Sequence, residues 1–590
     1  MKGTTEVLEP AARPATAFRS PVSTWRLGRG WSYAAIVTAA ALLWILRWAG
    51  PIDLRYDAAV YYVLGTSIAE GKGYRLLNEP GQPEALQYPP LLPLAIAGVQ
   101  KLAGTSDPDV VAVWLRRGYA VMFLGFAAAV LALARRFLPP LAALVAAAIC
   151  VAQPNVYLVS DVLFTELPFT MAVVGMALVL TNERGGERRW LREGAAFLLG
   201  AAAFLLRTAG IAVLAAWVGE ALLRKRWKLA LVRALLAVIP VAGWQAHVAR
   251  VQASADYREP AYAYQRAGYQ FYNVSYAENM ALIDPFRPEL GRATAKDWVA
   301  RIGDNLAAMP TALGEAVSGN MGFWRALMHG LPEEQIQEAR WLNDVARFPL
   351  LVLFGFVLVG AVVLVKRREW FVVLLTAGSI ALVCTTPWPG QFGRYVTPMA
   401  PFLTIALVAG LMGVAAHLWA QPRLASRRLG WAVVGIGAIV LLLQANGAWL
   451  LFRQRHWEPA TRVEGAGLMA PRLFFYGRVW KDWQTAVDWI ARRANQDDVI
   501  ATTSPHLSYL QTGLRAVMPP MEADARKARE LLESAGVDWV IVDDLAFLDI
   551  SRRYARPAVE NSGGQWEAVA RMGSATVYRR VQAAEERSGT

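Results

Sequence analysis

Charged residues at the edges of long apolar segments are the first candidates for chemistry in this sequence. Asp57 follows the first apolar segment, in IDLRYDAAVYYVLGTSIAEGKGY, and Asp161 and Glu166 lie between two later segments, in SDVLFTELPFT. Charged groups are costly to bury in or near a membrane, so residues of this kind are expected to have a structural or functional role there. One reason is helix-start chemistry, with Asp57 as an N-cap and Glu166 in a first turn behind Thr165. The alternative is that the acidic sites meet in one pocket on one membrane face.

Two arginines are candidate anion-binding groups beside the same predicted membrane surface. Arg207 stands between two apolar runs in FLLRTAG, and Arg394 stands in the Pro- and Gly-rich stretch PWPGQFGRYVTPMAP. Either side chain could snorkel to the lipid headgroups. The functional alternative is phosphate recognition, because a guanidinium directs two donors onto one anion. Arg116 and Arg117, at the start of another apolar run, are weaker candidates.

Several common catalytic and binding motifs are missing from the sequence. The five histidines are scattered, and Cys150 and Cys384 both lie inside apolar runs. Neither a zinc site nor a disulfide framework is therefore expected. There is no Walker A loop, GxSxG elbow or GxGxxG fingerprint, which argues against ATP-driven transport and hydrolase chemistry. A divalent metal would have no clear site, so the cofactor is left open.

The elements that must position these residues are apolar segments long enough to cross a bilayer. The 590 residues are 55% hydrophobic and 18% charged. A hydrocarbon core about 30 Å thick needs about 20 apolar residues in a helix. The predicted spans are 31–50, 111–134, 138–157, 165–182, 190–206, 209–223, 228–248, 346–365, 370–386, 395–417 and 431–452. Residues 89–103 are too short and begin with Pro89 and Pro90, so we expect an interfacial or re-entrant helix there.

The net charge of +14 is concentrated in short clusters between the apolar segments. Such clusters mark the cytoplasmic side of a membrane protein and explain the charge better than binding to nucleic acid. They predict a multi-pass protein of the cell (plasma or inner) membrane, with residues 1–30 as a cytoplasmic tail and no cleaved signal peptide. Two loops, 51–110 and 250–345, and a soluble domain, 453–590, are then extracytoplasmic.

The C-terminal region has the pattern of a small α/β domain. DDVIATTS and VDWVIVDD are predicted as buried parallel strands, and each is flanked by helical runs. The fold class expected from the whole sequence is therefore a multi-pass α-helical membrane protein of about eleven transmembrane helices with a C-terminal soluble α/β domain.

Five stretches together resemble the GT-C integral membrane glycosyltransferases, in the branch of the protein O-mannosyltransferases and the lipid A aminoarabinose transferases. They are YDAAVYYVLGTSIAEGKGY, QYPPLLPLAIAG, SDVLFTELPF, FLLRTAG and QFGRYVTPMAPFL, and the match runs from about residue 31 to 410. Residues 31–452 would then be a GT-C-like transmembrane domain. WQTAVDWI, YLQTGLRAVMPP and DWVIVDD resemble the extracytoplasmic domains that often follow such cores.

The resemblance implies a donor sugar carried on a polyprenyl phosphate, contact with membrane lipid, and a glycan, lipid or protein acceptor. It also implies an acidic residue in the first outer loop, here Asp57, assisted by Glu166 or Asp161. The segment of Tyr88, Pro89 and Pro90 matches the part of the family that shapes the acceptor and lipid cleft, and Tyr61 is expected to belong to the same cleft. Protein mannosyltransferases have a His where Tyr88 stands, which leaves the acceptor open.

The hypothesis from the sequence is a glycosyltransferase in which Asp57 acts as general base on an acceptor hydroxyl. Arg207 and Arg394, with the neighbouring Tyr395, would bind the donor phosphate and stabilise the charge that develops on it. A single displacement implies inversion at the anomeric carbon. The alternative is a transporter or flippase for a lipid-linked sugar, which would need no base. Inverted repeats would favour a transporter, and we find none in the sequence.

Overall fold

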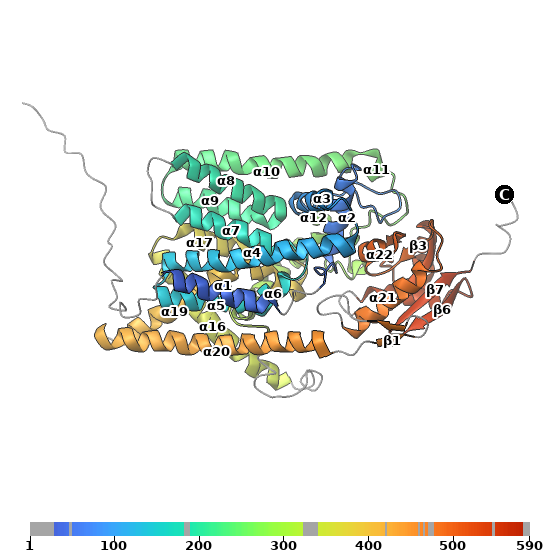
Figure 1. Ribbon diagram of the computed structural model, residues 1–590. Helices are drawn as coiled ribbons and strands as arrows, with labels where there is room; N and C mark the ends of the chain where they lie inside the picture. Colours follow the sequence, from blue (N-terminus) through green and yellow to red (C-terminus); the bar gives the residue numbers. More distant parts are fainter. Residues whose placement is uncertain are drawn as a thin grey trace, which may run out of the picture.

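The computed structural model describes residues 29–45, 50–181, 189–321, 340–418, 422–457, 461–463, 467–469, 477–545 and 549–581. In this part of the chain, a bundle of helices forms most of the molecule and a smaller unit with a β-sheet packs against one end of the bundle (Figure 1). The helices of the bundle are α1 (Arg29–Ile45), α4 (Pro108–Phe137), α5 (Pro140–Ala152), α6 (Pro154–Val159), α7 (Glu166–Thr181), α8 (Arg189–Leu206), α9 (Ile211–Leu223), α10 (Trp227–Ala253), α13 (Ala295–Ala316), α16 (Arg340–Lys366), α17 (Trp370–Cys384), α19 (Ala400–Leu418) and α20 (Pro422–Trp457).

Four described helical stretches are long and apolar enough to cross a membrane: Pro108–Phe137, Trp227–Ala253, Asp344–Lys366 and Pro389–His417. Each of the eleven predicted spans overlaps a helix, although several of these helices are shorter than the four. The number of crossings stays a prediction. Residues 89–103 form the short helix α3 (Leu91–Ala103), which begins directly after the two prolines.

The structure differs from the expected segments in three places. The segment 138–157 is broken into α5 and α6 at Gln153, because the residue before a proline disfavours helical backbone. The last helix, α20, continues to Trp457, beyond the expected end at 452. The loop 250–345 contains α13, whose second half is buried in the bundle at Met309 and Leu313.

Small residues allow the closest packing between helices in the bundle. A Cβ atom at Gly360 of α16 would collide with the carbonyl of Ala406 in α19, and one at Gly410 of α19 would collide with the carbonyl of Phe356. Backbones can approach this closely only where side chains are absent, as is common between helices in membranes. The pair α16 and α19 therefore forms a tightly fixed part of the core.

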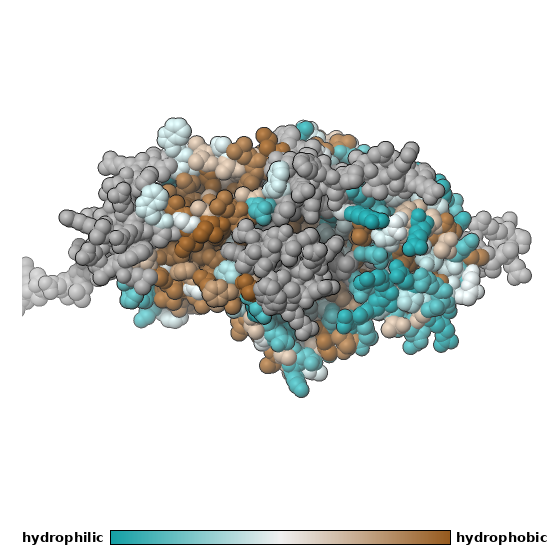
Figure 2. Space-filling model, turned by 90° about the horizontal axis from the view of Figure 1, so that it is seen from below, coloured by the Kyte–Doolittle hydropathy of each residue, from teal (hydrophilic) through white to brown (hydrophobic). Residues whose placement is uncertain are grey.

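The surface changes character along the molecule. On the face shown in Figure 2, hydrophobic residues gather over the helical part and hydrophilic residues gather toward the C-terminal unit. On α10, Leu231, Leu235 and Val238 are 63%, 63% and 58% exposed. Apolar side chains at this helical spacing, exposed on a long helix, are what a lipid-facing surface requires.

The C-terminal unit contains a five-stranded sheet in the order β4-β3-β5-β7-β6. Its strands are β3 (Val499–Ala501), β4 (Arg515–Val517), β5 (Val537–Val542), β6 (Trp566–Met572) and β7 (Ala575–Arg580). The first three are parallel, with Ile500 beside Ala516 and Trp539. Strand β7 pairs antiparallel with β5, and β6 pairs antiparallel with β7. The helices α21 (Arg478–Ala491), α22 (Pro505–Thr512) and α23 (Ala525–Ser534) accompany the sheet, as the predicted parallel strands require.

Candidate active site

A guanidinium shared by two carboxylates forms the centre of the candidate site. Arg394 Nη2 lies 2.7 Å from Asp57 Oδ2, and Arg394 Nε lies 2.5 Å from Glu166 Oε1. Arg207 Nη1 approaches the same oxygen of Glu166, at 2.7 Å. The structure thus brings four of the residues expected from the sequence into one cluster. The charges of its two carboxylates are balanced by the charges of its two guanidinium groups.

Helix ends place these side chains. Asp57 and Glu166 are the first residues of α2 (Asp57–Ala69) and α7, where the helix dipole stabilises a negative charge. Arg207 directly follows α8, and Arg394 lies in the short helix α18 (Phe392–Val396). Both acids and both arginines therefore lie at the same end of the helical bundle.

The expectation that Asp57 is an N-cap is wrong. The cap position is held by Tyr56, and the carboxylate of Asp57 instead binds Arg394 and Tyr272. Tyr56 has φ 60°, a left-handed conformation that is unfavourable for a bulky residue, and it packs against Phe164 and Trp480. The helix α2 is buried on all sides along most of its length.

Tyr272, from the segment 250–345, completes the surroundings of Asp57. Its hydroxyl donates a hydrogen bond to Asp57 Oδ1 at 3.2 Å. Burial, together with the charge of Asp57, raises the pKa of the Tyr272 phenol well above its usual value, so the group stays protonated. Asp57 is therefore held by a cation on one oxygen and by a neutral donor on the other.

Asp161 is placed apart from this cluster. Its carboxylate forms a buried ion pair with Arg116, which also donates to the carbonyl of Pro51 at 2.8 Å. The adjacent Val162 forms a parallel bridge with Asp53, which is paired in turn with Arg55. Of the two acids in SDVLFTELPFT, only Glu166 joins Asp57, and Arg116 serves as a partner of Asp161 at this boundary.

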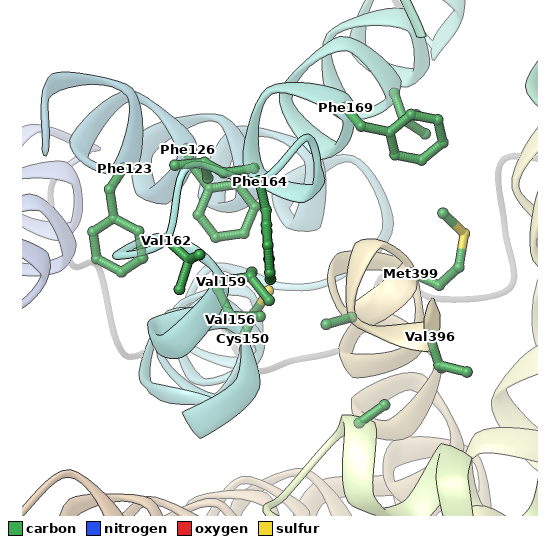
Figure 3. Close-up of a cluster of buried hydrophobic side chains, with 14 of the residues drawn as sticks. Phe123, Phe126, Cys150, Val156, Val159, Val162, Phe164, Phe169, Val396 and Met399 are labelled. Carbon is green, nitrogen blue, oxygen red and sulfur yellow. The ribbon is translucent and has the colours of Figure 1, made fainter. Parts of the chain in front are cut away.

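The cluster borders a cavity of about 730 Å³ between the helical bundle and the C-terminal unit. Asp57, Arg394 and Tyr395 line the cavity, whereas Glu166 is fully buried and contacts it only through Arg394. The apolar floor beside Arg394 is formed by Phe164, whose ring lies 3.8 Å from the guanidinium carbon. Figure 3 shows Phe164 among the buried side chains of α4, α6 and α7 that support this floor.

The residues expected to form an acceptor and lipid cleft have different positions. Tyr88 lines the cavity and contacts both Tyr61 and Tyr272, with ring centroids 4.8 and 6.0 Å apart. Tyr61 is buried behind Tyr88, and Pro89 and Pro90 precede α3 without lining the cavity. Tyr88 is therefore the member of this set that a ligand could contact.

The C-terminal unit supplies cavity residues that the sequence did not single out. Trp480 lies edge-on to Tyr56, with ring centroids 5.5 Å apart, and also lies 5.3 Å from the Arg55 guanidinium. His506 lies edge-on to Tyr272, with ring centroids 4.8 Å apart. The polar stretch TTSPH, which begins in the last residues of the predicted strand DDVIATTS and runs past its end, was the available signal, because residues at the carboxyl ends of parallel strands commonly bind ligands.

Metal coordination has no support in this part of the chain. Among the described residues, no group of three or more His, Cys, Asp or Glu side chains could hold a metal ion. Asp57 and Glu166 are instead neutralised by arginines.

Comparison with known proteins identifies the architecture. No protein-family model matches the sequence, and no curated protein matches it. The chain is similar to the archaeal oligosaccharyltransferase AglB from Archaeoglobus fulgidus, solved with an inhibitory peptide and a dolichol-phosphate, with a TM-score of 0.52 and 11% identity over 94% of this chain and 74% of AglB.

It is also similar to ArnT from Cupriavidus metallidurans bound to undecaprenyl phosphate. The TM-score is 0.51 and the identity is 12%, over 94% of this chain and 98% of ArnT. The two similarities cover both the helical bundle and the C-terminal unit. The likeness therefore shows that this chain shares the overall fold of these two proteins.

Proposed function

We propose that the protein is a glycosyltransferase that moves a sugar from a polyprenyl-phosphate donor to an acceptor hydroxyl, with inversion, on the extracytoplasmic side of the cell membrane. The observation that carries this proposal is the Arg394 guanidinium, which contacts Asp57 and Glu166 at the edge of a cavity. A base, a phosphate-binding cation and a space for substrates are thus adjacent. The lipid phosphates bound to AglB and ArnT support a donor of the same chemistry.

The two arginines would bind the donor phosphate. In the cluster their charges are balanced by Asp57 and Glu166. A phosphate entering the cavity competes with Asp57 for Arg394, because a guanidinium pairs well with phosphate. Binding of the donor would therefore release one Asp57 oxygen, while Glu166 keeps both arginines in place.

Asp57 would then act as general base. The acceptor hydroxyl gives its proton to Asp57 while its oxygen forms a bond to the anomeric carbon. The bond from that carbon to the phosphate oxygen breaks, and lipid phosphate leaves with the electron pair. Arg394 and Arg207 stabilise the charge that develops on the leaving group. Attack from the face opposite the phosphate inverts the anomeric configuration.

The proposed orientation rests on the charge of the loops. Basic clusters lie on one side of the predicted spans, which favours a cytoplasmic N-terminal tail and an extracytoplasmic cavity and C-terminal domain. A polyprenyl-phosphate sugar in the membrane could reach such a cavity from the lipid. The domains proposed are a tail at 1–30, a transmembrane domain at 31–452 and an extracytoplasmic domain at 453–590.

The test uses full-length protein in lipid vesicles with a radiolabelled polyprenyl-phosphate sugar. Asp57→Asn should lower transfer of label by about 10²- to 10⁴-fold, the usual contribution of general-base catalysis. Glu70→Gln is the matched control, because Glu70 is exposed at the other end of α2. Unchanged transfer by Asp57→Asn would refute the proposal. Label that only crosses the vesicle membrane, equally in both variants, would favour a flippase.

A further inference from the structure

The parallel strands of the C-terminal sheet direct their carboxyl ends toward the cavity. Each strand is followed within a few residues by a lining residue: Ser504 after β3, Met518 after β4 and Leu545 after β5. In open α/β sheets, ligands bind outside the carboxyl ends of the strands, at the point where the strand order reverses. The order β4-β3-β5 places that point between β3 and β5. The cavity therefore includes the position where such a sheet commonly binds a ligand.

The cavity-lining side chains at this sheet edge, Thr503, Ser504 and His506, are polar and neutral. Thr503 Oγ1 donates to Asp543 Oδ2 at 2.9 Å, which joins the ends of β3 and β5. Ser504 and His506 follow and line the cavity. Burial lowers the pKa of His506 to about 3, so its imidazole is neutral at physiological pH. Within the described residues, His506 Nε2 has no hydrogen-bond partner.

Aromatic rings connect this edge to the proposed base. Tyr272 contacts His506 with its ring and Asp57 with its hydroxyl, and Trp480 lines the same cavity. A ligand bound at the sheet edge would therefore lie next to Asp57. Flat aromatic faces beside neutral hydrogen-bonding groups match a sugar ring, which has apolar C–H faces and a rim of hydroxyls.

We propose that the acceptor is a neutral carbohydrate whose ring binds between Ser504 and His506 of the sheet edge and the rings of Tyr272 and Trp480. One of its hydroxyls faces Asp57. This inference rests on the proposed function: the hydroxyl proton goes to Asp57, the acceptor oxygen bonds to the anomeric carbon, and the donor lipid phosphate departs with the bonding electrons.

A peptide acceptor fits this part of the cavity less well. Extended peptides commonly add to an exposed edge strand, and β4 is the edge strand of the sheet nearest the cavity. Asn78, in the segment 51–110, already pairs with the backbone of β4. The Ala516 N–H donates to the Asn78 carbonyl at 2.8 Å, and Asn78 Nδ2 donates to the Ala516 carbonyl at 3.0 Å.

An anionic acceptor also fits this side of the cavity less well. Arg55 is paired with Asp53 at 2.5 Å, and Arg394 is shared between Asp57 and Glu166. Arg478 is the remaining lining arginine among the described residues, and it is exposed. The polar groups that are buried at the sheet edge carry no positive charge.

The test measures protection of an introduced thiol in full-length protein in lipid vesicles. In Ser504→Cys, neutral methyl glycosides and short oligosaccharides should slow alkylation by N-ethylmaleimide about fivefold when they occupy roughly four-fifths of the protein. Leu545→Cys provides a second probe in the cavity should Ser504→Cys fold poorly. Gln565→Cys is the control, because Gln565 is exposed and does not line the cavity, and the native Cys150 and Cys384 are buried.

Protection of Ser504→Cys or Leu545→Cys by neutral sugars, without protection of Gln565→Cys, supports the proposal. No protection, or protection only by sugar phosphates or by Ser- and Thr-containing peptides, overturns it. The measurement needs no turnover, so it is separate from the test of Asp57. Protection together with full transfer by Asp57→Asn would leave a sugar site and refute the proposed mechanism. Asp57-dependent transfer without protection would refute the acceptor site alone.

Discussion

Tyr272 and Asp57 are 215 positions apart in the sequence and meet through a hydrogen bond of 3.2 Å. The tyrosine comes from the segment 250–345, and the aspartate begins α2 in the segment 51–110. Tyr272 also packs against Tyr88 and against His506 of the C-terminal unit. One side chain thus links both segments and the C-terminal unit at the proposed base, which makes its hydroxyl a positioning group for Asp57.

Tyr272→Phe should lower kcat about tenfold and leave the KM for the donor unchanged. The substitution removes one hydrogen bond to a charged group, for which a loss of about 1.5 kcal/mol is expected, and it keeps the ring. Steady-state rates at varied donor concentration separate the two parameters. Tyr257→Phe is a matched control, because Tyr257 in the same loop donates to the Glu278 carboxylate at 3.1 Å, away from the cavity. Equal rates in the two variants would contradict a role for Tyr272 at Asp57.

Arg394→Lys should cost more activity than Arg207→Lys. Arg394 uses two different nitrogen atoms to contact Asp57 and Glu166, and a lysine ammonium cannot reproduce that planar arrangement. We expect kcat to fall by about 10²- to 10³-fold for Arg394→Lys, as when a donor to a developing oxyanion is removed. Of the two acids, Arg207 contacts only Glu166. Arg207→Lys should therefore lower kcat about tenfold.

Turnover of labelled donor, with binding of polyprenyl phosphate measured in parallel, checks the order of these two effects. Arg250→Lys is the control, because Arg250 forms a largely exposed pair with Glu84. A pair of this kind contributes little. If Arg394→Lys turned over donor at the normal rate, the shared guanidinium would have no part in catalysis.

Asp161 should matter for stability rather than for chemistry. Asp161→Leu would leave the buried Arg116 guanidinium without its counter-charge, at a cost of about 3–5 kcal/mol. Adding Arg116→Met should restore much of the loss, because an apolar pair of similar volume can replace a buried ion pair. Tryptophan fluorescence recorded during thermal unfolding compares the stability of the variants. Normal thermal stability of Asp161→Leu combined with loss of turnover would instead place Asp161 in the reaction.

The sequence predicted the parts of this site that depend on local pattern. Asp57 and Glu166 were found because each follows an apolar run and begins a helix on the same predicted membrane face. Spacing alone left Asp161 and Glu166 as alternatives. The structure separates them because Val162 bridges to Asp53, which turns the chain so that Asp161 meets Arg116.

Contacts between segments that are distant in the sequence could not be predicted from local sequence patterns. Tyr272 appeared in the sequence only as one of several tyrosines, and His506 only as one of five scattered histidines. Their positions depend on how the C-terminal sheet docks, for example through Asn78 and Ala516, which are 438 positions apart. No periodicity within one helix or strand reports such a pairing. Two of the three parallel strands, β3 and β5, were predicted, because their apolar runs are continuous.

Glu79 should make the stability of the contact between the segments 51–110 and 250–345 depend on pH. This residue of the first loop is buried, and its carboxylate accepts a hydrogen bond from the Tyr262 hydroxyl of the second loop at 2.6 Å. Burial raises the pKa of Glu79 to about 7, against the lowering effects of Tyr262 and its other hydrogen-bond partners. The folded protein therefore keeps this proton at a pH where the unfolded chain, with an ordinary Glu pKa near 4.5, has lost it.

The sign of the effect follows from proton binding. Below about pH 4.5 both states are protonated at Glu79 and its contribution to stability is complete. Between about pH 4.5 and 7 the unfolded state binds fewer protons, so the free energy of unfolding falls as the pH rises, by about 3 kcal/mol in total. Glu79→Gln, which is neutral at every pH and retains an acceptor for Tyr262, should remove this slope. Melting temperatures of the native protein and of Glu79→Gln from pH 4 to 8 test this. A melting-temperature advantage of the native protein over Glu79→Gln that stays constant or grows with rising pH would contradict the prediction.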